Sequence, residues 1–336
     1  MNRVKIIAEI GPNHNGSLIR AKKMIRQIST IGVDVIKFQI GDPELVYSKD
    51  SFKANYQKRF DNSKSIIEMS KKNQLKLTDH IKLFYFCQKY RIKYACSAFD
   101  LESLKKLNKK VNLPFFKIPS GEIHSVDILK YMSKQKKNII LSTGMATLDE
   151  ISKSLKILKK NGKKKIILLH CVSSYPTEDS KLNLNFMDTL KKKFNLEIGF
   201  SDHSKGDLAC LAAVSKGAKV IEKHVTMSKN FVGPDHKSSY TIREFKNLVK
   251  KIRNLEKILG KNIKKFFKDE INVKKVSRKS LVTTKDLSKN HKIAKSDLTF
   301  KRPGIGISPL DINLIIGKKI KKAIKKNKII KRSNIK

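Results

Sequence analysis

The sequence contains no tryptophan, few cysteines and no long apolar run. Cys87, Cys96, Cys171 and Cys210 show no C-x-x-C or metal-like spacing, so we expect reduced, buried thiols in a cytoplasmic protein. No run approaches the roughly 18 apolar residues that cross a membrane. The stretch from Met1 to Gly11 lacks the apolar core and cleavage site of a signal peptide. We therefore expect neither export nor membrane insertion.

Acidic residues and arginine are also scarce. The chain has 75 Lys and Arg against 29 Asp and Glu, a formal net charge of +46, but only ten of the basic residues are arginine. Proteins that read nucleic acids rely on arginine for bidentate contacts. The lysines here are spread from Lys5 to Lys336 without a segregated basic arm. This pattern indicates solvated surface lysines and makes nucleic-acid binding an unfavoured main role.

The length of 336 residues allows one large domain with a small appendage, or two medium domains. Short β-branched runs alternate with amphipathic stretches, which is typical of βα units around a parallel sheet. The predicted strands, in chain order, are residues 5–10, 33–39, 93–99, 115–119, 138–143, 165–172, 197–201 and 220–225.

Two of the predicted helices carry explicit start signals. Thr147 with Glu150, and Thr241 with Glu244, have the spacing of capping boxes, and Gly260 ends the helical pattern that follows Thr241. Eight βα units within residues 1–260 predict a (β/α)8 TIM barrel. The long connection over residues 41–76 is then an insertion next to the active site.

The pattern changes after Gly260. Residues 261–276 are rich in lysine and lack a sustained apolar stripe, which predicts a linker with about one helical turn. Residues 277–336 show short alternating runs and turn residues, which predict a small, mostly β module. A module of this size needs to dock on a partner surface to be very stable.

Polar side chains interrupt the predicted strands near their carboxyl ends, which meet on one face of a barrel. Lys37 and Lys117 stand inside apolar runs, so they are not ordinary surface lysines. Together with nearby hydroxyls they suit a ligand that carries phosphate and carboxylate groups. The hydroxyls are those of Ser97, Ser120, Ser142 and Ser201.

Two histidines end neighbouring predicted strands. His203 and His224 would therefore lie side by side, and neutral imidazoles with open positions suit a divalent metal such as Mn, Fe or Zn. A pair of hydrogen-bonded core histidines is the alternative interpretation. Nearby carboxylates could act as a general base, bind sugar hydroxyls or balance charge. They are Glu9, Glu122, Asp202 and Asp235, and hydroxyl binding is favoured for the first and the last.

Nine collinear strings carry a resemblance that covers nearly the whole chain. They are AEIGPNHNG, IKFQ, FFKIPSGE, LSTGMAT, LLHCVSSYPT, GFSDHS, IEKHVT, GPDHKSS and KRPGIGISP. In this order they resemble the sialic acid synthase family, in which a (β/α)8 barrel precedes a C-terminal antifreeze-like (SAF) domain. The resemblance implies condensation of phosphoenolpyruvate with N-acetylmannosamine or a related acetamido sugar. The products would be a nine-carbon 2-keto acid and phosphate.

The resemblance also implies roles for individual residues. Phosphoenolpyruvate would be held by Lys37, Ser97, Lys117, Ser120, Ser142, Ser173 and Ser201. The sugar would contact Glu9, Gln39, Tyr175, Asp235 and, from the SAF domain of the other subunit of a domain-swapped homodimer, Arg302. His203 and His224 would bind the metal, Mn²⁺ foremost, with Mg²⁺ or Co²⁺ as alternatives. Lys37, Lys117 and the candidate base Glu122 would be catalytic.

Departures from the family pattern bear on the substrate. Ser173 stands where some members carry Asn, and Pro119 stands where many carry Gly. These features lean towards relatives that make N,N'-diacetyllegionaminic acid from a diacetamido sugar. Two other functions stay open: a 3-deoxy-octulosonate 8-phosphate type synthase using a phosphorylated sugar, and a basic protein that binds polyanions. The Arg302 module argues against the first, which would need a second basic cluster instead.

Overall fold

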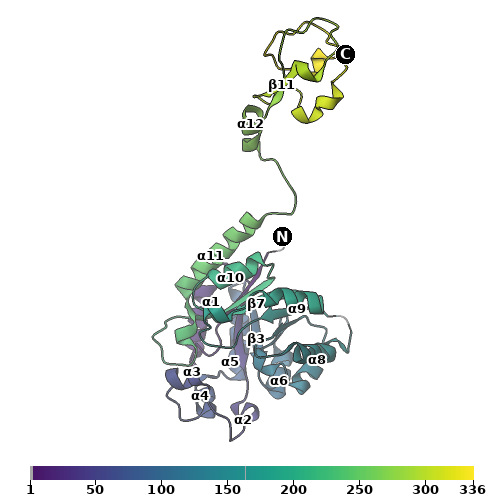
Figure 1. The fold of residues 1–336 in the computed structure, drawn as a ribbon. Coiled ribbons are helices and arrows are strands. Elements are labelled where there is room, and N and C mark those ends of the chain that lie inside the picture. The colour runs from purple at the N-terminus through teal and green to yellow at the C-terminus, as the bar shows by residue number, and fades with distance from the viewer. Residues whose placement is uncertain (1–2, 163) are drawn as a thin grey trace. The chain divides into compact units, whose positions relative to one another are not determined.

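The computed structural model describes residues 3–162 and 164–336, which form two compact units divided after Gly260. The first unit is a barrel of eight parallel strands in sequential order, closed by pairing of the first strand with the eighth (Figure 1). The predicted TIM barrel is therefore confirmed. The strands are β1 (Lys5–Glu9), β2 (Val35–Ile40), β3 (Lys93–Ala98), β4 (Phe116–Ile118), β5 (Ile139–Ser142), β6 (Ile166–His170), β7 (Glu197–Asp202) and β8 (Val220–Thr226).

Helices follow the strands and cover the outside of the barrel (Figure 1). They are α1 (Leu18–Ile28), α5 (Leu77–Lys89), α6 (Leu101–Lys110), α7 (Val126–Ser133), α8 (Leu148–Lys159), α9 (Phe186–Phe194), α10 (Leu208–Ser215) and α11 (Ile242–Leu259). Both predicted capping boxes are formed, because the Thr147 and Thr241 hydroxyls accept from the backbone N–H groups of Glu150 and Glu244. Gly260 follows α11 with a φ of 56°, a backbone conformation that favours glycine.

The connection after β2 holds three further helices, α2 (Pro43–Val46), α3 (Asn55–Phe60) and α4 (Ile66–Asn73). A two-residue strand, β9 (Tyr240–Thr241), pairs with the end of β8. Lysines on the outer helices are exposed, as the run Lys191 to Lys193 on α9 illustrates. All four cysteines are buried and unpaired, as expected.

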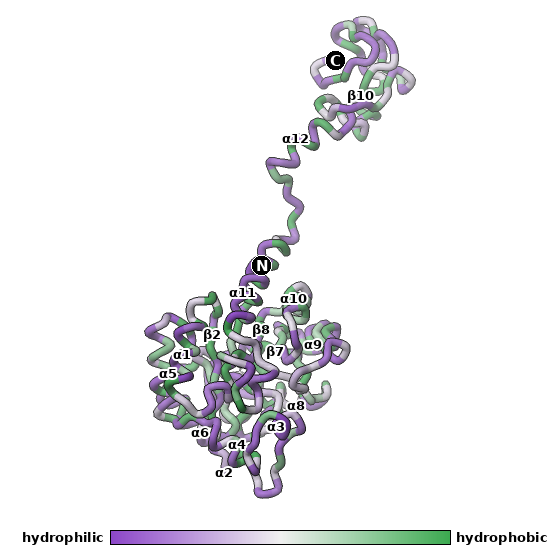
Figure 2. Tube along the Cα trace, turned by 90° about the vertical axis from the view of Figure 1, so that its left-hand side faces the viewer, coloured by the Kyte–Doolittle hydropathy of each residue, from purple (hydrophilic) through white to green (hydrophobic). Residues whose placement is uncertain are grey.

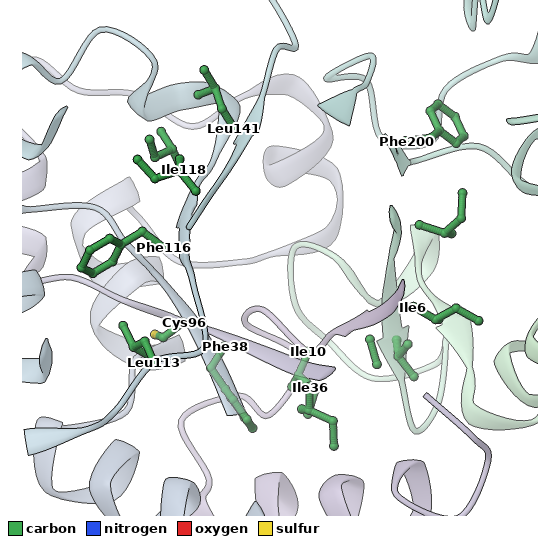
Figure 3. Packing of buried hydrophobic residues seen from close by; sticks show 14 of the residues in the cluster. Ile6, Ile10, Ile36, Phe38, Cys96, Leu113, Phe116, Ile118, Leu141 and Phe200 are labelled. Atoms are coloured by element: carbon green, nitrogen blue, oxygen red, sulfur yellow. The ribbon is translucent and has the colours of Figure 1, made fainter. Parts of the chain in front are cut away.

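Apolar side chains pack on both sides of the barrel wall. Phe38, Phe116 and Phe200 point outwards towards the helices, in the cluster shown in Figure 3. A second cluster fills the barrel interior. Its members include Ile7, Val35, Ala95, Ile140, Leu169 and Val220. Each fully buried Val, Leu or Ile side chain contributes roughly 1.5–3 kcal/mol relative to an exposed one.

Towards the carboxyl ends of the strands, the inward-facing positions change from apolar to polar residues. Because side chains alternate between the faces of a strand, the residue two positions after an inward apolar residue also faces inwards. Thus Ile7 is followed by Glu9, and Val35 is followed by Lys37. The pairing of β1 with β2 sets Glu9 directly beside Lys37. The strand carboxyl ends therefore gather the polar side chains that the sequence singles out.

The second unit has its own apolar core, in which Leu281, Ile320 and Ile330 are completely buried. Its named strands are only β10 (Ser280–Thr283) and β11 (Leu298–Lys301), an antiparallel pair, and isolated bridges and 3₁₀ turns form much of the rest. In the described residues, no helix of either unit is long and apolar enough to cross a membrane.

The expected linker contains more helix than the sequence suggests. Helix α12 spans Lys268–Ser277, ten residues rather than about one turn, so that prediction is wrong. Asp269 and Glu270 lie in its first turn and Lys274 and Lys275 in its last, an arrangement that the helix dipole favours. The helix has no buried residue, which is why an apolar stripe does not reveal it. Figure 2 shows hydrophilic residues interspersed with apolar ones along the preceding segment, residues 261–267.

Replacement of Gly199 in β7 tests the packing of the barrel wall. A Cβ at this position would lie 2.5 Å from the Val220 carbonyl oxygen and 2.6 Å from Leu169 Cδ2, both within the barrel. We expect Gly199→Ala to lower the free energy of unfolding by roughly 1–3 kcal/mol through overpacking. Thermal denaturation measures this change. Gly121→Ala, where a Cβ meets nothing within 4 Å, is the matched control for stability, and an equal loss in both variants would contradict the packing argument.

The buried carboxylate of Asp297 should make the stability of the second unit depend on pH. Burial alone would raise the pKa of this carboxyl, but bonds from Lys285 at 2.8 Å, His291 at 2.7 Å and the Ala294 N–H at 2.9 Å lower it overall. A lowered pKa means that the ionised carboxylate stabilises the fold above its ordinary pKa near 3.8, and that this stabilisation is lost as the pH falls.

We therefore expect Asp297→Asn to destabilise the second unit by on the order of 3 kcal/mol at neutral pH. The difference from the unchanged protein should shrink below about pH 4. Thermal unfolding of the full chain at both pH values checks this expectation. Asp311→Asn, which removes a half-exposed carboxylate 4.0 Å from Arg332, should have little effect. A pH-independent loss in Asp297→Asn would contradict the assignment.

Candidate active site

A cavity of about 400 Å³ opens at the carboxyl ends of the barrel strands. It brings together most of the residues that the sequence singles out. From the strands come Lys37, Gln39, Lys117, Ser142, Ser201 and His224. From the loops that follow them come Ser120, Ser173, Tyr175, His203 and Asp235.

The floor of the cavity holds two buried ammonium groups. Lys37 Nζ lies 2.5 Å from Glu9 Oε2 and 3.8 Å from Glu222 Oε1, and Lys117 Nζ lies 3.6 Å from the same Glu222 oxygen. All four side chains are almost completely buried. Glu222 is a residue that the sequence analysis missed. Alternation in β8 would have revealed it, because Glu222 lies two residues before His224 and therefore on the same face.

These charges shift one another's pKa values. Burial would raise the pKa of Glu222, but Lys117 and Lys37 lower it overall, so it stays ionised. Burial would lower the pKa of Lys37, and the carboxylates of Glu222 and Glu9 raise it overall. The pKa of Lys117 is lowered, because burial outweighs its attraction to Glu222. Burial also raises the pKa of Glu9 to about 7. The floor thus sets two buried lysines against two buried carboxyl groups, of which Glu222 stays ionised and Glu9 has a pKa of about 7.

Hydroxyl groups surround the lysines. Lys37 donates to Ser97 Oγ at 3.2 Å, and Lys117 donates to Ser142 Oγ at 2.7 Å. The Ser201 hydroxyl donates to Glu222 at 3.3 Å. This combination of ammonium and hydroxyl donors, in a partly enclosed cavity, suits an anion with several oxygens.

A glycine after β5 completes this anion-binding half. The Gly144 N–H donates to Ser120 Oγ at 3.0 Å. A Cβ on Gly144 would collide with the hydroxyls of Ser120 and Ser173, so only glycine lets the loop approach this closely. Ser120 Oγ also lies 3.1 Å from Cys171 Sγ.

His203 and His224 face one another, with ring centroids 5.7 Å apart. His203 Nδ1 lies 2.8 Å from the Val172 carbonyl oxygen, which fixes that nitrogen as the donor and leaves Nε2 unprotonated. His224 Nδ1 lies 3.4 Å from Asp235 Oδ2 and is otherwise a buried nitrogen without a hydrogen bond. Burial lowers the pKa of both imidazoles, and neutral imidazoles are the form that binds metals.

The histidine pair therefore fits a divalent cation that draws its remaining ligands from water or substrate. Across residues 3–162 and 164–336, no group of three or more His, Cys, Asp and Glu side chains could hold a metal ion by itself.

Several predicted residues lie elsewhere. Glu9 and Ser97 do not line the cavity. Both instead bind the Lys37 ammonium group, Glu9 as an ion pair and Ser97 as a hydrogen-bond acceptor. Glu122 is half-buried outside the lining residues, where its carboxylate accepts from the Ser125 hydroxyl, and burial raises its pKa.

The two remaining candidates are Asp202 and Arg302. Asp202 directly follows the inward-facing Ser201 in β7, so its side chain points away from the barrel interior. There it forms a buried ion pair with Lys223 at 2.5 Å. Arg302 belongs to the second unit, where it is exposed and precedes a cis bond to Pro303.

An aromatic column stands beside the histidines. The Tyr175 ring lies 4.2 Å from the His203 ring, and the Tyr56 ring lies 4.9 Å from that of Tyr175. Tyr56 belongs to α3, within the long connection after β2 that was predicted to be an active-site insertion. Sequence reasoning missed Tyr56, because no strand end or charged motif marks it.

The family model for the NeuB family matches residues 24–264, and the model for the SAF domain matches residues 278–336. The chain belongs to the NeuB family. The predicted family is thereby confirmed, with the barrel and the SAF domain in the predicted order.

Named relatives cover nearly all of this NeuB family chain. An N,N'-diacetyllegionaminic acid synthase of Campylobacter jejuni is 43% identical over 98% of this chain and 100% of that protein. The enzyme of the same name from Legionella pneumophila is 38% identical over 94% of this chain and 90% of that protein. The structure of an N-acetylneuraminic acid synthetase from Leptospira borgpetersenii superposes with a TM-score of 0.71 at 34% identity, over 81% of this chain and 90% of that one.

Glu222→Gln tests the charge balance of the floor. Without this carboxylate the Lys117 and Lys37 ammonium groups lose a shared partner, so we expect the free energy of unfolding to fall by on the order of 3 kcal/mol. The cavity then carries one more positive charge, so inorganic phosphate should stabilise the variant more than it stabilises the unchanged protein. Thermal unfolding with phosphate or chloride at equal ionic strength measures both effects.

The control for this variant is Glu178→Gln, which removes an exposed carboxylate paired with Lys181 and should change neither quantity. If Glu222→Gln unfolds at the same temperature as the unchanged protein, Glu222 does not neutralise the two lysines.

Proposed function

We propose that this chain is a nonulosonate synthase that condenses phosphoenolpyruvate with a 2,4-diacetamido-6-deoxy sugar. The products are N,N'-diacetyllegionaminic acid, a nine-carbon 2-keto acid, and phosphate. The observation that carries the choice of sugar is the 43% identity, over almost the whole of both chains, with the Campylobacter jejuni synthase of that product. N-acetylmannosamine, the sugar expected first from the sequence, becomes the alternative.

The anion-binding half of the cavity suits phosphoenolpyruvate. Lys37 and Lys117 supply charge-assisted donors for its carboxylate and phosphate. The hydroxyls of Ser120, Ser142, Ser173 and Ser201 fix its orientation, with Ser97 supporting Lys37. With both substrates held close together, C3 of phosphoenolpyruvate attacks the aldehyde carbon of the sugar. This positioning can supply roughly 7–11 kcal/mol of the rate enhancement.

Water then adds at C2, and the tetrahedral intermediate expels phosphate. Glu122 is the proposed base for this water, because it directly follows the cavity-lining residues Ser120 and Gly121, and burial raises the pKa of its carboxyl, which makes the carboxylate a stronger proton acceptor. Glu222 is less suited to this role, since two lysines hold its pKa down. Glu222 instead balances the charge of the floor.

The sugar half of the site is proposed to include Gln39, Tyr175 and Asp235, which line the cavity, with Glu9 acting through Gln39. Gln39 Nε2 donates to Glu9 Oε1 at 2.8 Å, so these two side chains form one polar unit. Arg302 would reach the N-acyl group from the SAF domain of the other subunit of a domain-swapped homodimer. A divalent cation on His203 and His224, Mn²⁺ foremost with Mg²⁺ or Co²⁺ as alternatives, would supply Lewis-acid polarisation of the aldehyde.

The test is phosphate release from phosphoenolpyruvate with Mn²⁺, with and without a chelator. N-acetylmannosamine, its 2,4-diacetamido-6-deoxy analogue and arabinose 5-phosphate are offered separately. We expect chelator-sensitive release with the diacetamido sugar, at a kcat/KM above that for N-acetylmannosamine. A preference for N-acetylmannosamine would make this a sialic acid synthase. Release only with the pentose phosphate would overturn the proposal in favour of a sugar-phosphate synthase, and no release with any acceptor would favour a polyanion-binding protein.

A further inference from the structure

The cavity has two chemically different halves. Its floor is charged and comes from the strands, as described above. Its outer part comes from the insertion after β2, which contributes no charged side chain to the lining. This part mixes apolar, phenolic and amide groups, including those of Val46, Tyr47, Tyr56, Gln57, Met69 and Asn73. The insertion therefore shapes the half of the cavity that faces away from the anion-binding floor.

Tyr56 belongs to this outer half and is linked to the histidine pair by Tyr175. Its ring stacks on Tyr175 at an interplanar angle of 29°, and Tyr175 in turn contacts His203 and meets the edge of His224 at 5.9 Å. Burial, followed by the nearby carboxylate of Asp235, raises the pKa of Tyr56, so the phenol stays neutral. Tyr56 is not part of the hydrophobic core of the barrel. Its partly buried ring lines the cavity instead.

The position of Tyr56 is fixed from two sides. Lys53 Nζ donates to the carbonyl oxygens of Asp61 and Ser63, both at 2.7 Å, and lies 3.3 Å from the Asp61 carboxylate. These bonds close the segment around α3. The Gly233 N–H donates to the Phe60 carbonyl oxygen at 3.1 Å, which ties α3 to the loop of Asp235. Tyr56 is thus held in place before any sugar arrives.

Distances along the column indicate which part of the sugar Tyr56 meets. If the aldehyde carbon lies at the histidine pair, C4 stands three carbon–carbon bonds away, each about 1.5 Å long. The ring-to-ring steps from His203 to Tyr175 and from Tyr175 to Tyr56 are 4.2 Å and 4.9 Å. C4 itself, at most about 4.5 Å from C1, thus reaches Tyr175, while the acetamido substituent of C4 and the C6 methyl extend further, towards Tyr56. These carbons distinguish the two sugars, because the diacetamido sugar carries an acetamido group at C4 and a methyl at C6, whereas N-acetylmannosamine carries hydroxyls.

We propose that Tyr56 is a specificity-determining residue whose ring packs against the apolar distal substituents of a 2,4-diacetamido-6-deoxy sugar. This inference rests on the proposed function. A methyl group placed on an aromatic face is stabilised, while a hydroxyl in the same position loses water without gaining a partner. The insertion thereby selects the sugar, while the strands perform the condensation.

The experiment compares the unchanged protein with Tyr56→Ala and Tyr56→Phe, using both acetamido sugars at saturating phosphoenolpyruvate. We expect Tyr56→Ala to reduce the preference for the diacetamido sugar about tenfold, the value of one apolar contact. The loss should appear in KM for that sugar, with kcat little changed. Tyr56→Phe should keep the preference, because the ring provides the contact. Tyr85→Ala, which truncates a tyrosine that is 60% exposed on α5, is the control and should leave both sugars unaffected.

Binding without turnover separates this inference from the proposed function. Each sugar is titrated calorimetrically into the unchanged protein and Tyr56→Ala in the absence of phosphoenolpyruvate. The ratio of the two dissociation constants should change by the same factor as the kinetic preference. Equal weakening of both sugars, or an unchanged ratio, would overturn the role of Tyr56 even if the enzyme makes the proposed product. Failure of turnover with both sugars in the unchanged protein would instead reject the proposed function, whatever the binding ratio.

Discussion

The burial of two ammonium groups inside the barrel is the constraint on which the site depends. Lys37 and Lys117 can stay charged there only if carboxylates lie within a few ångströms. Closure of the barrel provides them, since β1 sets Glu9 beside Lys37 and β8 carries Glu222 between the two lysines. The charged floor is therefore a property of the strand register, and any change that shifts one strand leaves a buried charge without its partner.

The strands and helix starts were predictable from the sequence because each depends on local chemistry. Which face a polar residue occupies was harder to predict, since it depends on a shift of one residue. Asp202 and Ser201 are neighbours at the end of β7, yet only Ser201 faces the cavity. Glu222, Lys223 and His224 follow one another in β8, and only the alternation from His224 shows that Glu222 also faces inwards. Tyr56 could not be found, because its role follows from a loop folding back over the barrel.

Chemistry and selectivity are carried by different parts of the chain. The groups that suit phosphoenolpyruvate and the histidine pair belong to the strands or to the first residues after them, where the backbone is rigid. The residues that line the outer cavity belong to a long connection that Lys53 and Gly233 hold in place. Loops tolerate substitution far better than strands do. A barrel of this kind can therefore change its acceptor sugar without disturbing the condensation.

The exposed lysines of the outer helices have a kinetic consequence. Because Glu222 and the partly ionised Glu9 offset much of the charge of Lys37 and Lys117, the cavity itself contributes little to the attraction at long range. The net charge of +46 lies instead on the rest of the molecule and creates a positive potential around it. Such a field raises the diffusional encounter rate with small anions and is screened within about 10 Å at 0.1 M salt. The outer surface of the protein thus sets how fast small anions meet it, and the floor sets how a bound anion is oriented.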